Sequence, residues 1–259
     1  MSLNKYSIYI PSKGRYDKNL TADLFLQNEI PFRLVVEPQD ERGYVKAFGR
    51  SKVLILHEND RGVAYVRNWI KKYSALAGEK YHWQIDDDIR TFKRRIENKN
   101  VKTNPLDVLL EVEAEVDKYS NIGQAGITSD VFAFSSKKDI YINRQIYSVM
   151  LFNNEVPVSF RENTIDDLDY SLQVLSSGWC TLFFTRIMFE LMPTMKQKGG
   201  NTDLEYVGDR REKLYEKIIA DYPGWFQFRD KRNSRGILTV KPSRIWKTFT
   251  QQPILKETE

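Results

Sequence analysis

Short apolar runs alternate with amphipathic stretches along the first third of the chain. Helical spacing of apolar positions predicts helices over residues 21–28 and 62–73. Runs rich in β-branched and aromatic side chains predict buried strands over residues 5–10, 32–36, 53–56 and 81–85. Because strands that alternate with helices favour right-handed βαβ units, we expect an α/β fold with a mainly parallel, Rossmann-type sheet flanked by helices.

The remainder of the chain continues this alternation. The patterns predict a helix from Asn104-Pro105, strand–turn–strand over 122–134, a strand pair over 140–151, a helix over 167–177, a strand over 179–184 and a helix over 204–222. Neither a repeat nor an obvious linker separates these segments. We therefore expect a catalytic domain over residues 1–195, and a basic extension of helix and loop over 196–259 that packs on the same domain.

Three consecutive aspartates follow the predicted strand 81–85: Asp86, Asp87 and Asp88. Carboxylates a few ångströms apart repel one another, and hard cations such as Mg²⁺ or Mn²⁺ neutralise them while bringing phosphates. Open α/β sheets bind ligands beyond the carboxyl ends of their strands. The triplet therefore predicts a metal–diphosphate site. An acidic turn followed by a basic helix start over residues 90–95 is the alternative interpretation.

A polar loop, Pro11-Ser-Lys-Gly-Arg15, follows the first predicted strand. Ser12, Lys13 and Arg15 offer hydrogen-bond donors to the base, ribose or phosphate of a nucleotide. The helix after the third strand carries Arg67, which could face the same mouth of the sheet. Taken singly, each of these features is equally compatible with a basic surface turn or an exposed arginine.

Three acids open the predicted helix over 167–177: Asp166, Asp167 and Asp169. A helix dipole favours acids in the first turn by about 0.3–1 kcal/mol each. One or two acids would satisfy that preference. A third leaves a carboxylate to face a cleft, where it could serve as a base or a substrate clamp.

In this order and spacing, the motifs resemble the GT-A class of nucleotide-sugar glycosyltransferases. That class combines a proline-terminated first strand, an Arg-Asn helix, an Asp-x-Asp metal motif and an acidic helix followed by a glycine and an aromatic strand. More narrowly, the segments 10–15, 83–89 and 130–134 are similar to the TET-associated glycosyltransferases of bacteriophages. Those enzymes add sugars to hydroxymethylated pyrimidines in DNA. The resemblance runs from about residue 5 to 185.

The resemblance implies a role for each motif. Asp86 and Asp88 would bind Mn²⁺ or Mg²⁺, directly or through the ribose and a water, with Asp88 as the direct ligand. Asp167 would deprotonate the acceptor hydroxyl, with Asp166 beside it. The implied donor-binding residues are Pro11, Ser12, Lys13, Arg15, Arg67, Asp86 and Asp87.

Three departures from the family pattern leave details open. Asp166 stands where glutamate is commoner, and Gln173 stands where a basic residue often follows. These two differences leave open which acid is the base and whether the reaction inverts the sugar. The usual histidine ligand near the C-terminus is missing, and Lys196 or Lys198 could contact the diphosphate instead.

The chain has 259 residues and a net charge of +5, and an excess of that size lies in its last quarter. From residue 229 to 247 there are seven basic side chains and one acidic one, with aromatic residues nearby. Such interleaving suits a polyanion with stackable bases, whereas a solvated surface over core aromatics is the alternative. The candidate DNA-binding residues are Lys196, Lys198, Arg229, Lys231, Arg232 and Arg235.

Several classes are excluded by composition. One cysteine, Cys180, allows no intramolecular disulfide, and two histidines are too few for a histidine-based zinc site. No signal peptide or membrane span is apparent, which favours the cytoplasm, of a host cell if the protein is viral.

We therefore expect a hexosyl- or pentosyltransferase that moves a sugar from a nucleotide-diphosphate donor, a UDP-sugar being favoured. Its acceptor would be a 5-hydroxymethylpyrimidine in DNA. A glycosyltransferase of cell-surface glycan or lipid acceptors, and a DNA-binding module without catalysis, are the alternatives.

Overall fold

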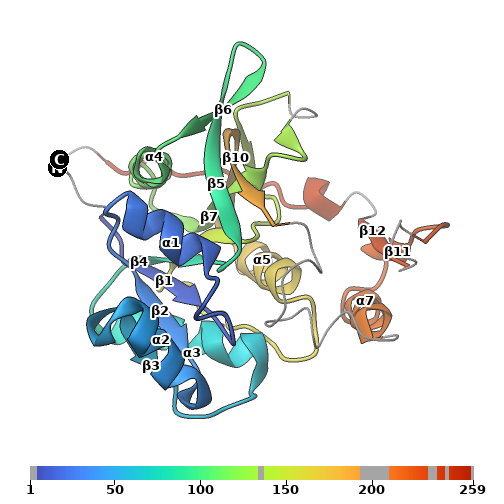
Figure 1. Ribbon diagram of the computed structural model, residues 1–259. Coiled ribbons are helices and arrows are strands. Elements are labelled where there is room, and N and C mark those ends of the chain that lie inside the picture. Colours follow the sequence, from blue (N-terminus) through green and yellow to red (C-terminus); the bar gives the residue numbers. More distant parts are fainter. Residues whose placement is uncertain (1–4, 134–136, 193–209, 233–237, 243–244, 258–259) are drawn as a thin grey trace.

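The computed structural model describes residues 5–133, 137–192, 210–232, 238–242 and 245–257, and its central feature is a ten-stranded sheet (Figure 1). The strands of this sheet are β1 (Ile8–Pro11), β2 (Arg33–Val36), β3 (Val53–Ile55), β4 (Tyr81–Ile85), β5 (Ile89–Ile96), β6 (Lys99–Thr103), β7 (Ile122–Ser129), β8 (Ile140–Ile142), β9 (Val149–Asn153) and β10 (Cys180–Leu191). The helices are α1 (Leu20–Gln27), α2 (Glu41–Phe48), α3 (Gly62–Leu76), α4 (Pro105–Val116), α5 (Asp166–Ser176) and α7 (Arg210–Asp221). Short 3₁₀ turns cover Pro38–Asp40, Arg50–Lys52 and Ile245–Lys247.

The strand order is β3-β2-β1-β4-β9-β7-β10-β5-β6, and β8 pairs with β10. Parallel pairing joins β3, β2, β1 and β4, and also β7 and β10. Strand β9 lies antiparallel between β4 and β7, so these two strands still point the same way. Only β9, β5 and β8 among the strands of this sheet run in the opposite direction. The expected α/β class with a mainly parallel sheet is confirmed.

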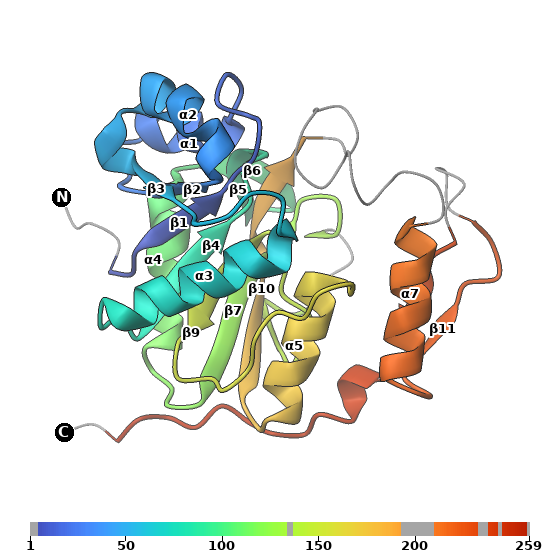
Figure 2. The same cartoon turned by 90° about the horizontal axis from the view of Figure 1, so that it is seen from below.

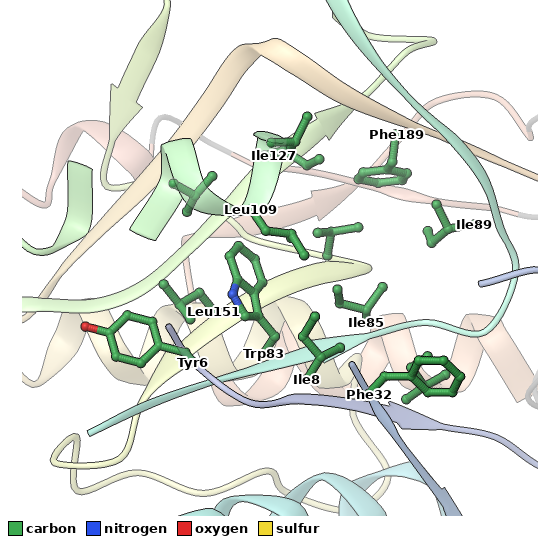
Figure 3. Close-up of a cluster of buried hydrophobic side chains, with 14 of the residues drawn as sticks. Tyr6, Ile8, Phe32, Trp83, Ile85, Ile89, Leu109, Ile127, Leu151 and Phe189 are labelled. Atoms are coloured by element: carbon green, nitrogen blue, oxygen red, sulfur yellow. The ribbon is translucent and has the colours of Figure 1, made fainter. Parts of the chain in front are cut away.

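Helices cover both faces of the sheet because its strands alternate between two apolar surfaces. On one face, Phe25 of α1, Tyr44 of α2 and Val112 of α4 belong to one buried apolar cluster. Figure 3 shows part of this cluster, including Ile8 of β1, Trp83 of β4 and Leu109 of α4. On the other face, β-strand residues such as Tyr9 and Phe152 pack against α3 and α5. Figure 2 shows α3 and α5 lying across that second face.

Two sequence predictions fail for identifiable reasons. The predicted strand–turn–strand over 122–134 is a single strand, β7, followed by a turn. Gly126 lies within this strand and serves close packing, because a Cβ there would lie 2.5 Å from the carbonyl oxygen of Val149. The alternative interpretation of a basic helix over 90–95 is also wrong, because these residues form strand β5, whose Phe92 is fully buried.

The C-terminal segment packs against α5. Ile218 of α7, Phe226 of the hairpin β11 (Phe226–Phe228)–β12 (Val240–Pro242) and Ile245 form one buried cluster with Leu168 and Leu172 of α5. The division at residue 195 falls in a part of the chain outside the described residues and stays a prediction. Among the helices that the structure describes, none is long and apolar enough to cross a membrane.

Candidate active site

The candidate site lies where strands β1, β4, β7 and β10 end. These four strands point the same way, so their carboxyl ends share one edge of the sheet. The acid triplet Asp86–Asp88 forms the turn that joins β4 to β5 at this edge. Thr21 of α1 fixes the turn, because its hydroxyl donates to the carbonyl oxygen of Asp86 at 2.6 Å and accepts from the amide of Ile89 at 2.9 Å.

Asp87 points into the protein and is neutralised there. Its carboxylate accepts hydrogen bonds from Arg15 and from the Ser12 hydroxyl, the latter at 2.5 Å, and all three side chains are buried. Tyr44 supports this arrangement, since its hydroxyl lies 2.6 Å from the Ser12 hydroxyl and accepts from the Arg15 amide at 3.0 Å. The loop 11–15 is therefore fastened to the acidic turn through Asp87.

Arg67 joins the two acidic motifs of the sequence. Its Nη2 donates to Oδ1 of Asp86 at 2.9 Å and its Nε donates to Oδ2 of Asp166 at 2.8 Å. Burial alone would lower the pKa of Arg67, but the charges of Asp86 and Asp166 raise it above its ordinary value, so the side chain stays protonated. This one guanidinium brings the end of β4 within reach of the first turn of α5.

Asp88 differs from its neighbours because no basic side chain among the described residues forms an ion pair with it. The side chain is partly buried, and its carboxylate forms no ion pair within the described residues. Burial raises the pKa of Asp88 to about 7, and the charges of Asp86 and Asp87 add to the effect. The hydrogen bond from Arg67 to Asp86 uses Oδ1, so Oδ2 of Asp86 takes no part in it. Two carboxylates thus remain at this point for a positive ligand.

Asp167 is the second acid with a perturbed pKa. Burial and the neighbouring charge of Asp166 raise the pKa of its carboxyl to about 7, against a smaller lowering effect of Arg211. Asp167 Oδ1 accepts from the amide of Leu168 at 2.7 Å. Paired carboxylates whose environments differ in this way are typical of acid–base sites.

A comparison with family models decides the class. The model for the TET-Associated Glycosyltransferase family matches residues 6–200, which is most of the chain. The chain belongs to this family. The expected enzyme class, a nucleotide-sugar glycosyltransferase, is thereby confirmed.

Two further comparisons add little to this membership. A search of curated proteins found no match to this glycosyltransferase. Among solved structures, that of apo UDP-glucose pyrophosphorylase is similar, with a TM-score of 0.43 and 7% identity over 72% of this chain and 91% of that chain. A similarity of this extent carries no argument about function.

The remaining predicted donor-binding residues of the glycosyltransferase lie at the same edge. Pro11 is the last residue of β1. The ammonium group of Lys13 pairs with Glu37 at 2.9 Å and with Asp60 at 2.5 Å. Gly14 has φ of +63°, a conformation that favours glycine, and donates its amide to Asp40 at 2.8 Å. The structure thus brings the loop 11–15, Arg67 and the acid triplet together.

The start of helix α5 is anchored by a residue whose role the sequence did not reveal. Asp169 is fully buried and accepts hydrogen bonds from Arg161, from Gln173 at 2.8 Å and from the hydroxyl of Tyr222 at 2.8 Å. This network fixes the helix turn that carries Asp166, and it uses a residue from the C-terminal segment. Gln173, which departs from the family pattern, is therefore engaged with Asp169.

The predicted DNA-binding residues of the C-terminal segment are only partly described. Arg229 and Lys231 are exposed, whereas Arg232 pairs with Glu212. Lys196, Lys198 and Arg235 lie outside the described residues. The aromatic side chains nearby, which the sequence suggested as stacking partners, follow the alternative interpretation instead: Tyr222, Trp225, Phe226 and Trp246 pack in the cluster with α5.

Tyr44 and Thr21 also escaped the sequence analysis. The helix that carries Tyr44, α2, was not predicted, although Tyr44 and Phe48 stand four residues apart and stack on each other. Thr21 lies in a predicted helix, but nothing in the sequence indicated that its hydroxyl bonds to the acidic turn. Both residues act by holding the loop and the turn in place.

Proposed function

We propose that this glycosyltransferase transfers a sugar from a nucleotide-diphosphate donor to the hydroxyl of a 5-hydroxymethylpyrimidine in DNA, with Mg²⁺ or Mn²⁺ as cofactor. One observation carries the proposal: Arg67 holds Asp86 of the triplet and Asp166 of α5 at a single sheet edge. The two acids proposed to bind the cation and the two proposed for acid–base chemistry are therefore linked through one side chain. The DNA acceptor is proposed because the chain belongs to the TET-associated family.

The available carboxylates fit a cation that arrives with its substrate. Among the described residues, no group of three or more acidic, histidine or cysteine side chains is arranged to hold a metal ion. Mg²⁺, however, is usually bound by one or two carboxylates together with the phosphates of the substrate. Asp88, with Asp86 beside it, supplies such an oxygen-only set, while Asp87 is committed to Arg15. The cation would stabilise the negative charge that develops on the departing diphosphate.

The second pair of acids suits the acceptor. Asp167 has a pKa near the physiological range because burial and Asp166 both oppose its ionisation. A carboxylate with a raised pKa is a stronger base toward an alcohol than an ordinary aspartate. Arg67 keeps the Asp166 carboxylate oriented, so that Asp167 is the member of the pair left to accept the proton.

The test is sugar transfer to defined DNA. Enzyme, a panel of nucleotide sugars including UDP-glucose, Mn²⁺ and DNA containing 5-hydroxymethylcytosine are incubated, and the DNA is digested to nucleosides for mass analysis. We expect a glycosylated nucleoside with one donor, loss of the product on chelation, and its return with added Mn²⁺. Asp88→Asn should lower the transfer rate by about 100-fold or more, since charge stabilisation of the leaving group is lost.

Asp107→Asn is the matched control, because Asp107 is an exposed acid in the first turn of α4. It should leave the transfer rate unchanged. Transfer that persists in chelator, or equal rates for Asp88→Asn and the control, would show that the triplet holds no essential cation. Transfer to a glycan or lipid acceptor but not to DNA would refute the proposed acceptor.

A further inference from the structure

A basic groove lies beside the β5–β6 hairpin, away from the acid triplet. Its volume is about 360 Å³. The charged side chains that line it are Arg95, Glu97, Lys137, Lys138, Asp139 and Arg186. Four of these six are cations, so the groove carries net positive charge. No part of the proposed donor chemistry uses them.

The two acids of the groove are fewer than its four cations. Asp139 pairs with Arg186 at 2.6 Å, and both side chains are more than half exposed. Lys137 and Lys138, together with Lys99 at the hairpin tip, are exposed and form no ion pair within the described part of the chain. Two lysines of the groove and one at the hairpin tip therefore present charge to the solvent without an acidic partner among the described residues.

Further cations follow along the hairpin, and several of them are paired with acids: Arg90 lies 2.9 Å from Glu190, and Arg94 bonds to Glu111 at 2.5 Å. Lys93 of β5 lies directly opposite Lys102 of β6, an arrangement of like charges that destabilises an isolated hairpin. Lys93 is compensated by Asp130 at 2.8 Å and Glu190 at 2.5 Å. From Arg90 to Ile96, which pairs with Lys99, the strand extends for roughly 20 Å at about 3.3 Å per residue. A small anion needs donors that converge on one point, whereas a line of cations suits the phosphates of a polyanion.

This line leads to the candidate active site. Strand β5 begins at Ile89, directly after Asp88, so the hairpin projects from the acid triplet itself (Figure 1). The loop after β7 lies along the same strand, because Lys93 bonds to Asp130 and Arg95 donates to the carbonyl oxygen of Ala133 at 2.9 Å.

Two large apolar side chains of that loop are more than half exposed. Val131 is 75% exposed and Phe132 is 60% exposed. An aromatic side chain beside a row of cations is the usual means of binding a nucleic-acid strand, because bases stack on the ring while the cations hold the backbone. A membrane surface would be met by the same cations, but the spread of charge along a narrow hairpin favours a linear polyanion.

We infer that the β5–β6 hairpin and the basic groove bind the phosphate backbone of the acceptor DNA, and that Phe132 contacts its bases between the groove and the acid triplet. The inference rests on DNA being the acceptor, as proposed above. It assigns the DNA surface to the hairpin, in addition to the exposed C-terminal residues that the sequence suggested.

The experiment measures binding without catalysis. The variant Lys99→Gln/Lys137→Gln/Lys138→Gln is compared with the control Arg42→Gln/Lys46→Gln/Lys72→Gln, which removes the same charge from exposed residues of α2 and α3. Figure 1 shows these helices at the end of the molecule opposite to the hairpin. Fluorescence anisotropy of a labelled duplex containing 5-hydroxymethylcytosine, without nucleotide sugar, gives the Kd at several concentrations of KCl.

Each phosphate contact contributes about 0.9 to the slope of log Kd against log salt concentration. We therefore expect the slope of the hairpin variant to fall by up to ~2.7 relative to the wild type, and that of the control to change far less. Phe132→Ala should weaken binding while leaving the slope unaltered, because stacking releases no counterions.

Three outcomes would overturn the inference, and they are distinguishable. If the wild type binds the duplex but the hairpin variant keeps the slope of the control, the surface is wrong while the DNA acceptor stands. If the wild type binds no duplex, the proposed acceptor fails as well. If vesicles containing phosphatidylserine bind through these lysines and the duplex does not, the partner of the groove is a lipid surface.

Discussion

Three adjacent aspartates in this enzyme have three different environments. Asp86 shares Arg67 with Asp166, Asp87 is buried against Arg15, and partial burial raises the pKa of Asp88 to about 7. Burial raises the pKa of Asp87 too, although Arg15 and Ser12 oppose that effect. The same residue type therefore supplies a link between elements, a structural ion pair and a candidate ligand within one turn. Position relative to the nearest cation decides which task each carboxylate has.

Residue burial also creates a pH dependence that has nothing to do with catalysis. His82 is fully buried in β4, where its ring stacks on Phe152 and meets the edge of Tyr9. Burial, with a smaller contribution from the charge of Lys71, lowers the pKa of His82 to about 3. In the unfolded chain a histidine takes up its proton near pH 6.5.

Between these two pKa values the unfolded state binds the extra proton, so the free energy of unfolding must decrease as the pH falls. We expect His82 to account for a loss of about 2 kcal/mol between pH 7 and pH 5. Urea denaturation of wild type and His82→Gln over this range measures it: the variant should lose less stability on acidification. His57→Gln, at an exposed position, should keep the wild-type pH dependence. Parallel pH curves for all three proteins would refute the assignment.

At the scale of elements, Arg67 is the point where α3, β4 and α5 meet. It is 5% exposed, donates to Asp86 and Asp166, and lies over the ring of Phe160. Removal of one partner from a buried ion pair leaves the other charges uncompensated, at a cost of about 3–5 kcal/mol. The bridge therefore contributes both to folding and to the alignment of the two acidic motifs.

We accordingly expect Arg67→Met to lower the free energy of unfolding by about 3–5 kcal/mol. Arg67→Lys should recover part of that loss but not the sugar transfer, because an ammonium group cannot bond to both carboxylates with the planar geometry of a guanidinium. Urea denaturation and the transfer assay give the two readouts. Arg61→Lys, exposed on the residue before the same helix, is the control. Full transfer by Arg67→Lys would exclude the bridge as an alignment device.

Local patterns were sufficient to predict the elements that carry the acids but not their connections. The strand 81–85 and the helix capped by Asn104 follow from apolar spacing and a capping side chain, and both are observed. Side chains alternate in direction along an extended segment. If that alternation continues past residue 85, Asp87 is expected to point the opposite way from Asp86 and Asp88. In contrast, Arg67 and Tyr44 act through contacts that are distant in sequence, and no periodicity encodes a partner that lies 99 residues away.

The β5–β6 hairpin is a second feature that local sequence patterns could not predict. Its residues 90–95 are mostly polar and basic, so neither helical nor strand spacing dominates. Pairing with β10 decides the matter, since Phe92 lies opposite Phe189 in the sheet and both are fully buried. A strand stabilised by its neighbour in this way can carry cations on its exposed positions, which is the property that the DNA-binding inference requires.

At the scale of the whole molecule, the C-terminal tail is tied to the middle of the chain. Figure 2 shows it running along the sheet below α5. The side-chain amide of Asn143 donates to the carbonyl oxygen of Gln251 at 2.9 Å. The backbone amide of Ser120 donates to the carbonyl oxygen of Ile254 at 2.8 Å. These contacts lie near the beginnings of β7 and β10, at the edge opposite to the candidate site. The tail therefore supports the sheet without obstructing the substrate.

Gln251 tests whether that support is energetically significant. Its Nε2 donates to the carbonyl oxygens of Leu175 and Trp179, both at 2.9 Å, and so satisfies two groups at the end of α5. Gln251→Ala would leave both acceptors without this donor, and we expect a loss of about 1–3 kcal/mol in the free energy of unfolding. Gln252→Ala is the control, because within the described residues the side chain of Gln252 bonds only to the nearby carbonyl oxygen of Thr250. Thermal unfolding should separate the two variants by several degrees, roughly 2–4 °C per kcal/mol for a chain of this size. Equal melting temperatures would mean that the catalytic sheet does not depend on this attachment, and that α7 and the tail form an accessory unit.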